Sequence, residues 1–225
     1  MSEHGLTGLA NAKMACDPGQ MRYSTVVLGG SAGSLNALID LIPRLPRDFP
    51  WPIVAVVHLH PRQEGGFTEL LDRHCSLKVK EAEDKETILP GHVYFAPPNY
   101  HLLLEPDRTL SLSSDEAVNF SRPSIDVLFE SAADSCRAAL IGIVLTGSND
   151  DGARGLARIR EFGGLAVVQD PAQAEHPLMP EAAVQLARPE FVLPLCEIAN
   201  LLNTLAGCLP ATAGRTAPAN SKDRP

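Results

Sequence analysis

Val26-Val27-Leu28-Gly29-Gly30-Ser31-Ala32-Gly33-Ser34 joins a short apolar run to a glycine-rich turn with Ser31 at its centre. Three consecutive apolar residues are typical of a buried strand. Apolar residues then recur from Leu35 to Ile42 at the spacing of one helix face. The stretch therefore predicts a strand, a turn and a helix, with Ser31 on the turn. Gly29 to Gly33 also fits the pattern G-x-S-x-G, in which a sharp turn exposes a nucleophilic serine beside a helix N-terminus.

A phosphate-binding turn is the first alternative for the same glycines. The dinucleotide-binding pattern G-x-G-x-x-G requires glycine at three fixed positions, and a reading that starts at Gly29 finds serine at positions 31 and 34. That pattern is therefore excluded. An ordinary Gly-Ser turn without catalytic function remains open at this point.

The rest of the chain alternates strand-like apolar runs with helical patterns, which predicts an α/β fold. We expect a doubly wound, mostly parallel sheet with helices on both faces. The further strands are expected at Ile53–Val57, Leu140–Leu145, Ala166–Gln169 and Phe191–Leu193. Val79, Val93–Phe95 and the pair Leu102–Leu104 and Leu110–Leu112 predict a short β insertion with an antiparallel hairpin, because the pair flanks a turn-forming Glu-Pro-Asp-Arg.

Two helix starts carry sequence signals of their own. Ser124 precedes an apolar helical face that runs to Cys136, and its hydroxyl is expected to cap that helix. Pro180 is expected at the first position of a helix that extends to Ala187, because proline suits a helix start.

Length and composition predict one globular domain with loose ends. The chain has 225 residues, 44% hydrophobic and 20% charged. We expect a flexible N-terminal arm at residues 1–22, a catalytic domain at 23–208 and a disordered tail at 209–225. The net charge of −8 argues against a nucleic-acid-binding protein.

The cysteines and the hydropathy of the sequence indicate the cellular compartment of the protein. The five cysteines are scattered and form no C-x-x-C pair, so neither a disulfide framework nor a zinc site is indicated. No run approaches the roughly 20 apolar residues that cross a bilayer, so membrane insertion is not expected. A cytoplasmic protein fits both observations.

Three reactive side chains follow predicted strands: Ser31, His58 and Asp151. The carboxyl ends of parallel strands meet at one edge of a sheet, where ligands bind. Serine needs an imidazole to accept its proton, and the imidazole needs a carboxylate to fix its tautomer. The three residues therefore predict acyl transfer.

Other interpretations of these residues stay open from spacing alone. Histidine at a strand end is often structural, and aspartate before glycine often caps a helix. Asp150 competes with Asp151 for the carboxylate role. His60 lies two residues after His58, so both could bind a metal with one of these aspartates.

The chain resembles the catalytic domain of the chemotaxis-receptor methylesterases, the CheB family. The matching segments keep the family's order over about residues 23 to 205. They are Leu28–Ser34, Val56–Pro61, Lys80–Asp84, Leu89–Pro98, Arg122–Phe129, Leu145–Gly152, and Gln169–Pro171 with Met179–Ala182.

The resemblance assigns roles that spacing left open. It implies that Ser31 is the nucleophile, His58 rather than His60 the base, and Asp151 rather than Asp150 the carboxylate. It also implies hydrolysis of glutamate γ-methyl esters on the cytoplasmic helices of chemoreceptors, with glutamine deamidation as a second activity. The backbone N–H of Ser148 would help to hold the oxyanion, and Arg122 would help to bind an acidic receptor segment. A solvated or structural arginine is the alternative for Arg122. No metal or organic cofactor is implied.

Two departures from the family pattern qualify this expectation. Ser34 stands where glycine is usual, and it is compatible with a helix N-cap. About 22 residues precede the first strand, too few for the receiver domain that well-known members carry. We therefore expect a free-standing esterase that is either constitutively active or controlled by a separate regulatory protein. The alternatives are a non-catalytic receptor-binding module and a metal-dependent hydrolase.

Overall fold

The computed structural model describes residues 22–58 and 66–207. The expected tail at 209–225 and nearly all of the expected arm at 1–22 lie outside these residues. Among the described helices, none has the length and apolar character needed to cross a membrane.

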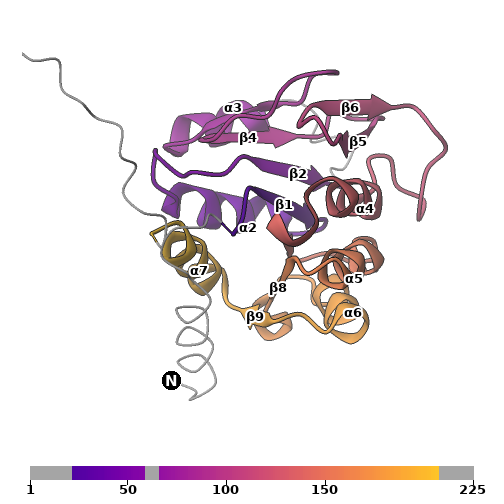
Figure 1. Ribbon diagram of the computed structural model, residues 1–225. Helices are drawn as coiled ribbons and strands as arrows, with labels where there is room; N and C mark the ends of the chain where they lie inside the picture. The colour runs from indigo at the N-terminus through magenta and orange to yellow at the C-terminus, as the bar shows by residue number, and fades with distance from the viewer. Residues whose placement is uncertain (1–21, 59–65, 208–225) are drawn as a thin grey trace, which may run out of the picture.

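A parallel sheet of seven strands forms the middle layer of the molecule (Figure 1). Its order is β3-β4-β2-β1-β7-β8-β9, and every neighbouring pair is parallel. The strands are β1 (Thr25–Gly30), β2 (Ile53–Val57), β3 (Lys78–Glu81), β4 (His92–Phe95), β7 (Leu140–Val144), β8 (Leu165–Gln169) and β9 (Phe191–Leu193). The central strands β1, β2 and β7 are buried along their whole length, as their unbroken apolar runs predict.

Helices cover both faces of this sheet (Figure 1). One hydrophobic core joins the sheet to α2 (Ser34–Leu41), α3 (Phe67–His74) and α7 (Leu195–Gly207). The other joins it to α4 (Ile125–Cys136), α5 (Ala153–Glu161) and α6 (Leu178–Ala187). Short 3₁₀ turns span Ile42–Arg44, Arg137–Ala139 and Pro171–Gln173. The predicted doubly wound α/β fold is confirmed.

The middle of the chain differs from the prediction in one respect. Only β5 (His101–Leu104) and β6 (Leu110–Ser113) form the separate antiparallel hairpin, which packs on α4. Val79 and Val93–Phe95, expected in the same insertion, instead belong to β3 and β4 of the main sheet. These strands have four residues each, and β3 lies at the sheet edge, so their sequence lacks the long apolar run of a central strand.

The predicted helix caps are wrong in detail. Ser124 precedes α4, but its hydroxyl makes no capping bond within that helix. Ser34 is the first residue of α2 and follows Gly33, whose φ of 78° lies in the left-handed region that favours glycine. Pro180 is the third residue of α6 rather than the first. Proline is tolerated there because the first turn of a helix has no intrahelical acceptor for its N–H groups.

Close packing of α4 on β1 brings the start of the helix beside the end of the strand. A Cβ atom on Gly29 would lie 2.3 Å from Ile125 Cγ2, at the first turn of α4. Glycine at this position therefore lets helix and strand approach each other. The N-terminus of α4 consequently lies near the carboxyl ends of the central strands, where the reactive residues were predicted.

Candidate active site

Ser31 follows the last residue of β1 and is half-buried. Its N–H donates to the Thr146 carbonyl oxygen (2.9 Å), which ties the end of β1 to the loop that follows β7. Its own carbonyl oxygen accepts a hydrogen bond from the Ser34 hydroxyl. Backbone contacts at both ends of the residue therefore fix the strand-to-helix turn predicted from the sequence.

His58 follows β2, the strand next to β1, and its side chain is 13% exposed. Its N–H donates to the Gly30 carbonyl oxygen (3.0 Å), which places residues 31 and 58 at adjacent strand ends. Its Nε2 lies 3.0 Å from Asp151 Oδ2. A carboxylate accepts hydrogen bonds, so we assign the ring proton to Nε2 and the free lone pair to Nδ1. Nδ1 is therefore the atom of His58 that is able to accept a proton.

Asp151 is fully buried and accepts five hydrogen bonds. His58 Nε2 and the Ile125 N–H (2.7 Å) reach its Oδ2. The Ser124 hydroxyl (2.9 Å), the Asp126 N–H (3.1 Å) and Asn119 Nδ2 (3.1 Å) reach its Oδ1. Ser124 thus donates to Asp151, and it is this carboxylate that caps α4.

The pKa of Asp151 reflects two opposing effects. Burial would raise the pKa of this carboxyl group, but the hydrogen bonds from His58, Ile125, Asn119 and Asp126 outweigh it and lower the pKa to about 2. Asp151 therefore stays ionised throughout the neutral range. A carboxylate with so low a pKa orients His58 and stabilises its charged form, but it is a poor acceptor for a proton.

The hydroxyl of Ser31 makes no hydrogen bond to His58 among the described residues. Asn149 Nδ2 instead lies 3.4 Å from His58 Nδ1, at the long end of hydrogen-bond distances. The structure thus joins His58 to Asp151 and brings Ser31 to the neighbouring strand end. Catalytic hydrogen bonds in unliganded enzymes are often long and tighten when substrate binds.

Of the residues of the metal hypothesis, His58 and Asp151 lie together in the part of the chain that is described. Asp150 is exposed, in contrast to the buried Asp151. His60 lies outside the described residues. Within residues 22–58 and 66–207, no three histidine, cysteine, aspartate or glutamate side chains are grouped so that they could hold a metal ion.

Ser148 lies in the loop after β7 and is exposed. The N–H of its neighbour Gly147 donates to the His176 carbonyl oxygen (3.0 Å), whereas the Ser148 N–H has no acceptor among the described residues. A backbone N–H without a protein acceptor is available to an incoming oxygen atom.

Arg122 is exposed, and its side chain bonds to the backbone of its own segment. Its Nη1 donates to the carbonyl oxygens of Ser114 (2.9 Å) and Asp115 (3.0 Å). These two bonds fasten the segment that leads from β6 to α4. The binding of a receptor segment by Arg122 stays a prediction.

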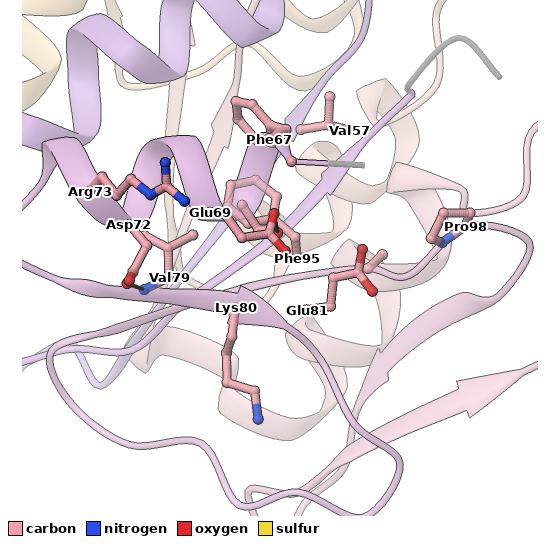
Figure 2. Close-up of a pocket in the computed structure, with 13 residues that line it drawn as sticks. Val57, Phe67, Glu69, Asp72, Arg73, Val79, Lys80, Glu81, Phe95 and Pro98 are labelled. Atoms are coloured by element: carbon pink, nitrogen blue, oxygen red, sulfur yellow. Dashed lines mark hydrogen bonds between the residues drawn. The ribbon is translucent and has the colours of Figure 1, made fainter. Parts of the chain in front are cut away.

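A cavity of about 430 Å³ lies beside the site, between α3 and the carboxyl ends of β2, β3 and β4 (Figure 2). Val57, the residue before His58, lines it together with Phe67 and Phe95. Charged side chains of both signs, including Arg73 and Glu81, complete its walls. Ser31, His58 and Asp151 do not line this cavity.

Three residues of the site were not predicted from the sequence as site residues. Asn119, Asn149 and Ser124 all contact Asp151 or His58. Asn119 and Asn149 lie in loops, where no periodicity marks a buried contact. Ser124 was noted as a helix cap, but nothing in the sequence indicates that its hydroxyl points to a residue 27 positions later.

The fold and the site together define a class of protein. A parallel α/β sheet carries a serine after one central strand, a histidine after the next, and a buried carboxylate bonded to that histidine. This set can perform acyl transfer in the manner of serine hydrolases. Comparison with known proteins narrows the class. The family model described as CheB methylesterase matches residues 26–202, so the chain belongs to the CheB methylesterase family and is an esterase.

Individual relatives agree with this assignment. The chain is 53% identical over 181 residues to a provisionally named protein-glutamate methylesterase/protein-glutamine glutaminase of Leptospira interrogans, covering 80% of this chain and 94% of that protein. It is 39% identical over 176 residues to protein-glutamate methylesterase FrzG of Myxococcus xanthus, covering 78% of this chain and 53% of FrzG, so it spans about half of that protein.

A solved structure shares the fold. The crystal structure of the Thermotoga maritima CheB methylesterase catalytic domain matches with a TM-score of 0.77 and 33% sequence identity. The match covers 80% of this chain and 98% of that domain. The resemblance stated from the sequence motifs is thereby confirmed.

Proposed function

We propose that this chain hydrolyses γ-methyl esters of glutamate residues on the helical cytoplasmic domain of chemoreceptors, and releases methanol. Ser31 is the nucleophile, His58 the general base and acid, and Asp151 the orienting carboxylate. The observation that carries the proposal is the 3.0 Å bond between His58 and Asp151, one strand away from Ser31, in a chain of the CheB methylesterase family.

The first half of the reaction forms a covalent ester. The Ser31 hydroxyl approaches His58 Nδ1 and attacks the carbonyl carbon of the glutamyl methyl ester while its proton passes to Nδ1. Protonated His58 carries positive charge, which Asp151 stabilises across Nε2. The tetrahedral intermediate collapses, His58 gives the proton to the departing methoxide, and methanol leaves.

The second half regenerates the enzyme with water. His58 accepts a proton from a water molecule, whose oxygen attacks the ester between Ser31 and the receptor glutamate. Breakage of that ester returns the proton to Ser31 and leaves a glutamate carboxylate on the receptor. The Ser148 N–H is the proposed oxyanion donor in both halves, because it has no acceptor among the described residues and lies on the loop beside the site.

Glutamine deamidation is a second candidate activity of the same site. Several relatives carry the double name protein-glutamate methylesterase/protein-glutamine glutaminase. The chemistry requires only that the leaving group be ammonia instead of methanol, with His58 as the proton donor. We expect both reactions to take place in the cytoplasm, where the receptor helices lie.

The direct test measures methanol release by the purified chain from receptor fragments that carry glutamate methyl esters. We expect release of methanol and a matching gain of receptor carboxylates, unchanged by a metal chelator. Turnover that the chelator abolishes and zinc restores would favour a metal-dependent hydrolase. Tight receptor binding without methanol release would favour a non-catalytic binding module.

A further inference from the structure

Two buried carboxylates lie side by side at the base of the site. Asp151 is 0% exposed and Asp126, at the second position of α4, is 1% exposed. Asp151, just before α5, caps α4, and Asp126, in the first turn of α4, caps α5. Asp151 accepts the N–H groups at the start of α4, and Asp126 accepts those of Gly152 (3.0 Å) and Gly155 (2.8 Å) at the start of α5. The N-termini of α4 and α5 are therefore linked, because each helix is capped by a carboxylate from beside the other.

Asn119 bridges these carboxylates with one nitrogen atom. Its Nδ2 donates to Asp126 Oδ2 (3.0 Å) and to Asp151 Oδ1 (3.1 Å). Asp126 Oδ2 also accepts a hydrogen bond from Arg154 Nε (3.1 Å), whereas Asp151 bonds to His58. Two like charges this close repel each other, and a donor shared between them offsets part of the repulsion.

The turn that carries Asn119 presents its neighbour to solvent. Val118 and Ser121 bridge each other across the turn, and both central residues adopt left-handed conformations, with φ of 51° at Asn119 and 60° at Phe120. Phe120 is fully exposed. The Asn119 amide therefore links the centre of this turn to Asp126 and Asp151.

We propose that Asn119 is a positioning residue, which holds Asp151 Oδ1 and thereby turns Oδ2 toward His58. Oδ1 accepts from Ser124, Asp126 and Asn119, and of these donors only the Asn119 amide also reaches the second carboxylate. The expected effect of Asn119 on catalysis rests on the proposed roles of His58 and Asp151. The expected effect of Asn119 on the environment of Asp151 does not depend on those roles.

Two substitutions separate this function from simple turn formation. Glycine adopts the left-handed conformation without strain, so Asn119→Gly keeps the turn and removes the donor. Aspartate also tolerates that conformation and keeps the shape of the side chain, but Asn119→Asp places a third carboxylate against the other two. A positioning function predicts that Asn119→Asp is the more harmful change. A turn-forming function predicts that both variants resemble the wild type.

The experiment measures kcat and KM for methyl-ester hydrolysis and, on the same variants, the titration of the Asp151 carboxyl group by ¹³C NMR. We expect kcat to fall about 10-fold in Asn119→Gly and about 100-fold or more in Asn119→Asp, with little change in KM. The pKa of Asp151 should rise in both, because the Asn119 hydrogen bond is one of those that lower it.

Phe120→Ala provides the matched control in the same turn, and it should leave the Asp151 titration unchanged. An unaltered Asp151 titration in both Asn119 variants would overturn the inference. Equal kcat values in the wild type, Asn119→Gly and Asn119→Asp would also overturn it. If the wild type releases no methanol, the proposed function fails, while the NMR titration still tests the link between Asn119 and Asp151.

Discussion

The two halves of the site are built in different ways. On the nucleophile side, backbone contacts fix the chain, with the Ser31 N–H bonded to Thr146 and the His58 N–H bonded to Gly30. The Ser31 hydroxyl itself has no bond to His58 among the described residues. On the acid side, five donors hold the Asp151 side chain directly. The difference indicates that the His58–Asp151 pair is formed before substrate arrives. The Ser31 hydroxyl, in contrast, forms its hydrogen bond to His58 only when substrate binds.

Asp151→Asn should have the largest effect of the changes on the carboxylate side, because it alters the preformed half. We expect kcat to fall roughly ten-thousand-fold, since an amide no longer fixes the His58 tautomer as a carboxylate does. Steady-state kinetics of methanol release checks this. Asp150→Asn is the control, because Asp150 is exposed and neighbours the same loop. The reverse pattern, with Asp150→Asn the inactive variant, would move the carboxylate role to Asp150.

Gly29→Ala should have the next largest effect, because it separates the two halves. The added Cβ would meet Ile125 Cγ2 at 2.3 Å and force α4 away from β1. Overpacking of this kind costs about 1 to 3 kcal/mol in the free energy of unfolding. Urea denaturation would measure the loss. Gly207→Ala is the control, since a Cβ there meets no atom of the described residues within 4 Å. Equal stability of both variants would show that α4 and β1 accommodate the added Cβ without cost.

Low pH should weaken the Asp151 side of the site by a comparable amount. The pKa of Asp151 is about 2 in the folded protein against an ordinary value of 3.8, so its ionised form stabilises the fold above pH 4. That contribution, roughly 2 kcal/mol, is lost as the pH falls from about 4 through about 2. Denaturation measured across this range should show a steeper loss in the wild type than in Asp151→Asn. Parallel curves would contradict the assignment of the lowered pKa to Asp151.

The sequence was sufficient for the parts of the site that follow strands. Unbroken apolar runs located β1, β2 and β7, and Ser31, His58 and Asp151 were recognised because they follow these runs. Spacing did not separate Asp150 from Asp151, and only the family resemblance favoured one of them. The structure gives the physical difference, because one carboxylate is buried against helix N-termini and the other is exposed.

The supporting contacts could not be predicted, because they depend on which helix ends meet. Ser124 carried a genuine helix-start signal, but its hydroxyl donates across the fold to Asp151. Asn119 lies in a turn, where asparagine is common for conformational reasons alone. The misassigned β3 and β4 have a similar cause, because short strands at or near a sheet edge depend on their neighbours more than on their own sequence.

We propose that Ser31 supplies the nucleophile to a His58–Asp151 pair that exists without it. The decisive measurement is methanol release by the Ser31→Ala variant from methylated receptor fragments. The low-field NMR signal of the His58 Nε2 proton checks that the pair is intact. We predict no release above the uncatalysed rate while the proton signal persists. Release at a rate near that of the wild type would contradict the account.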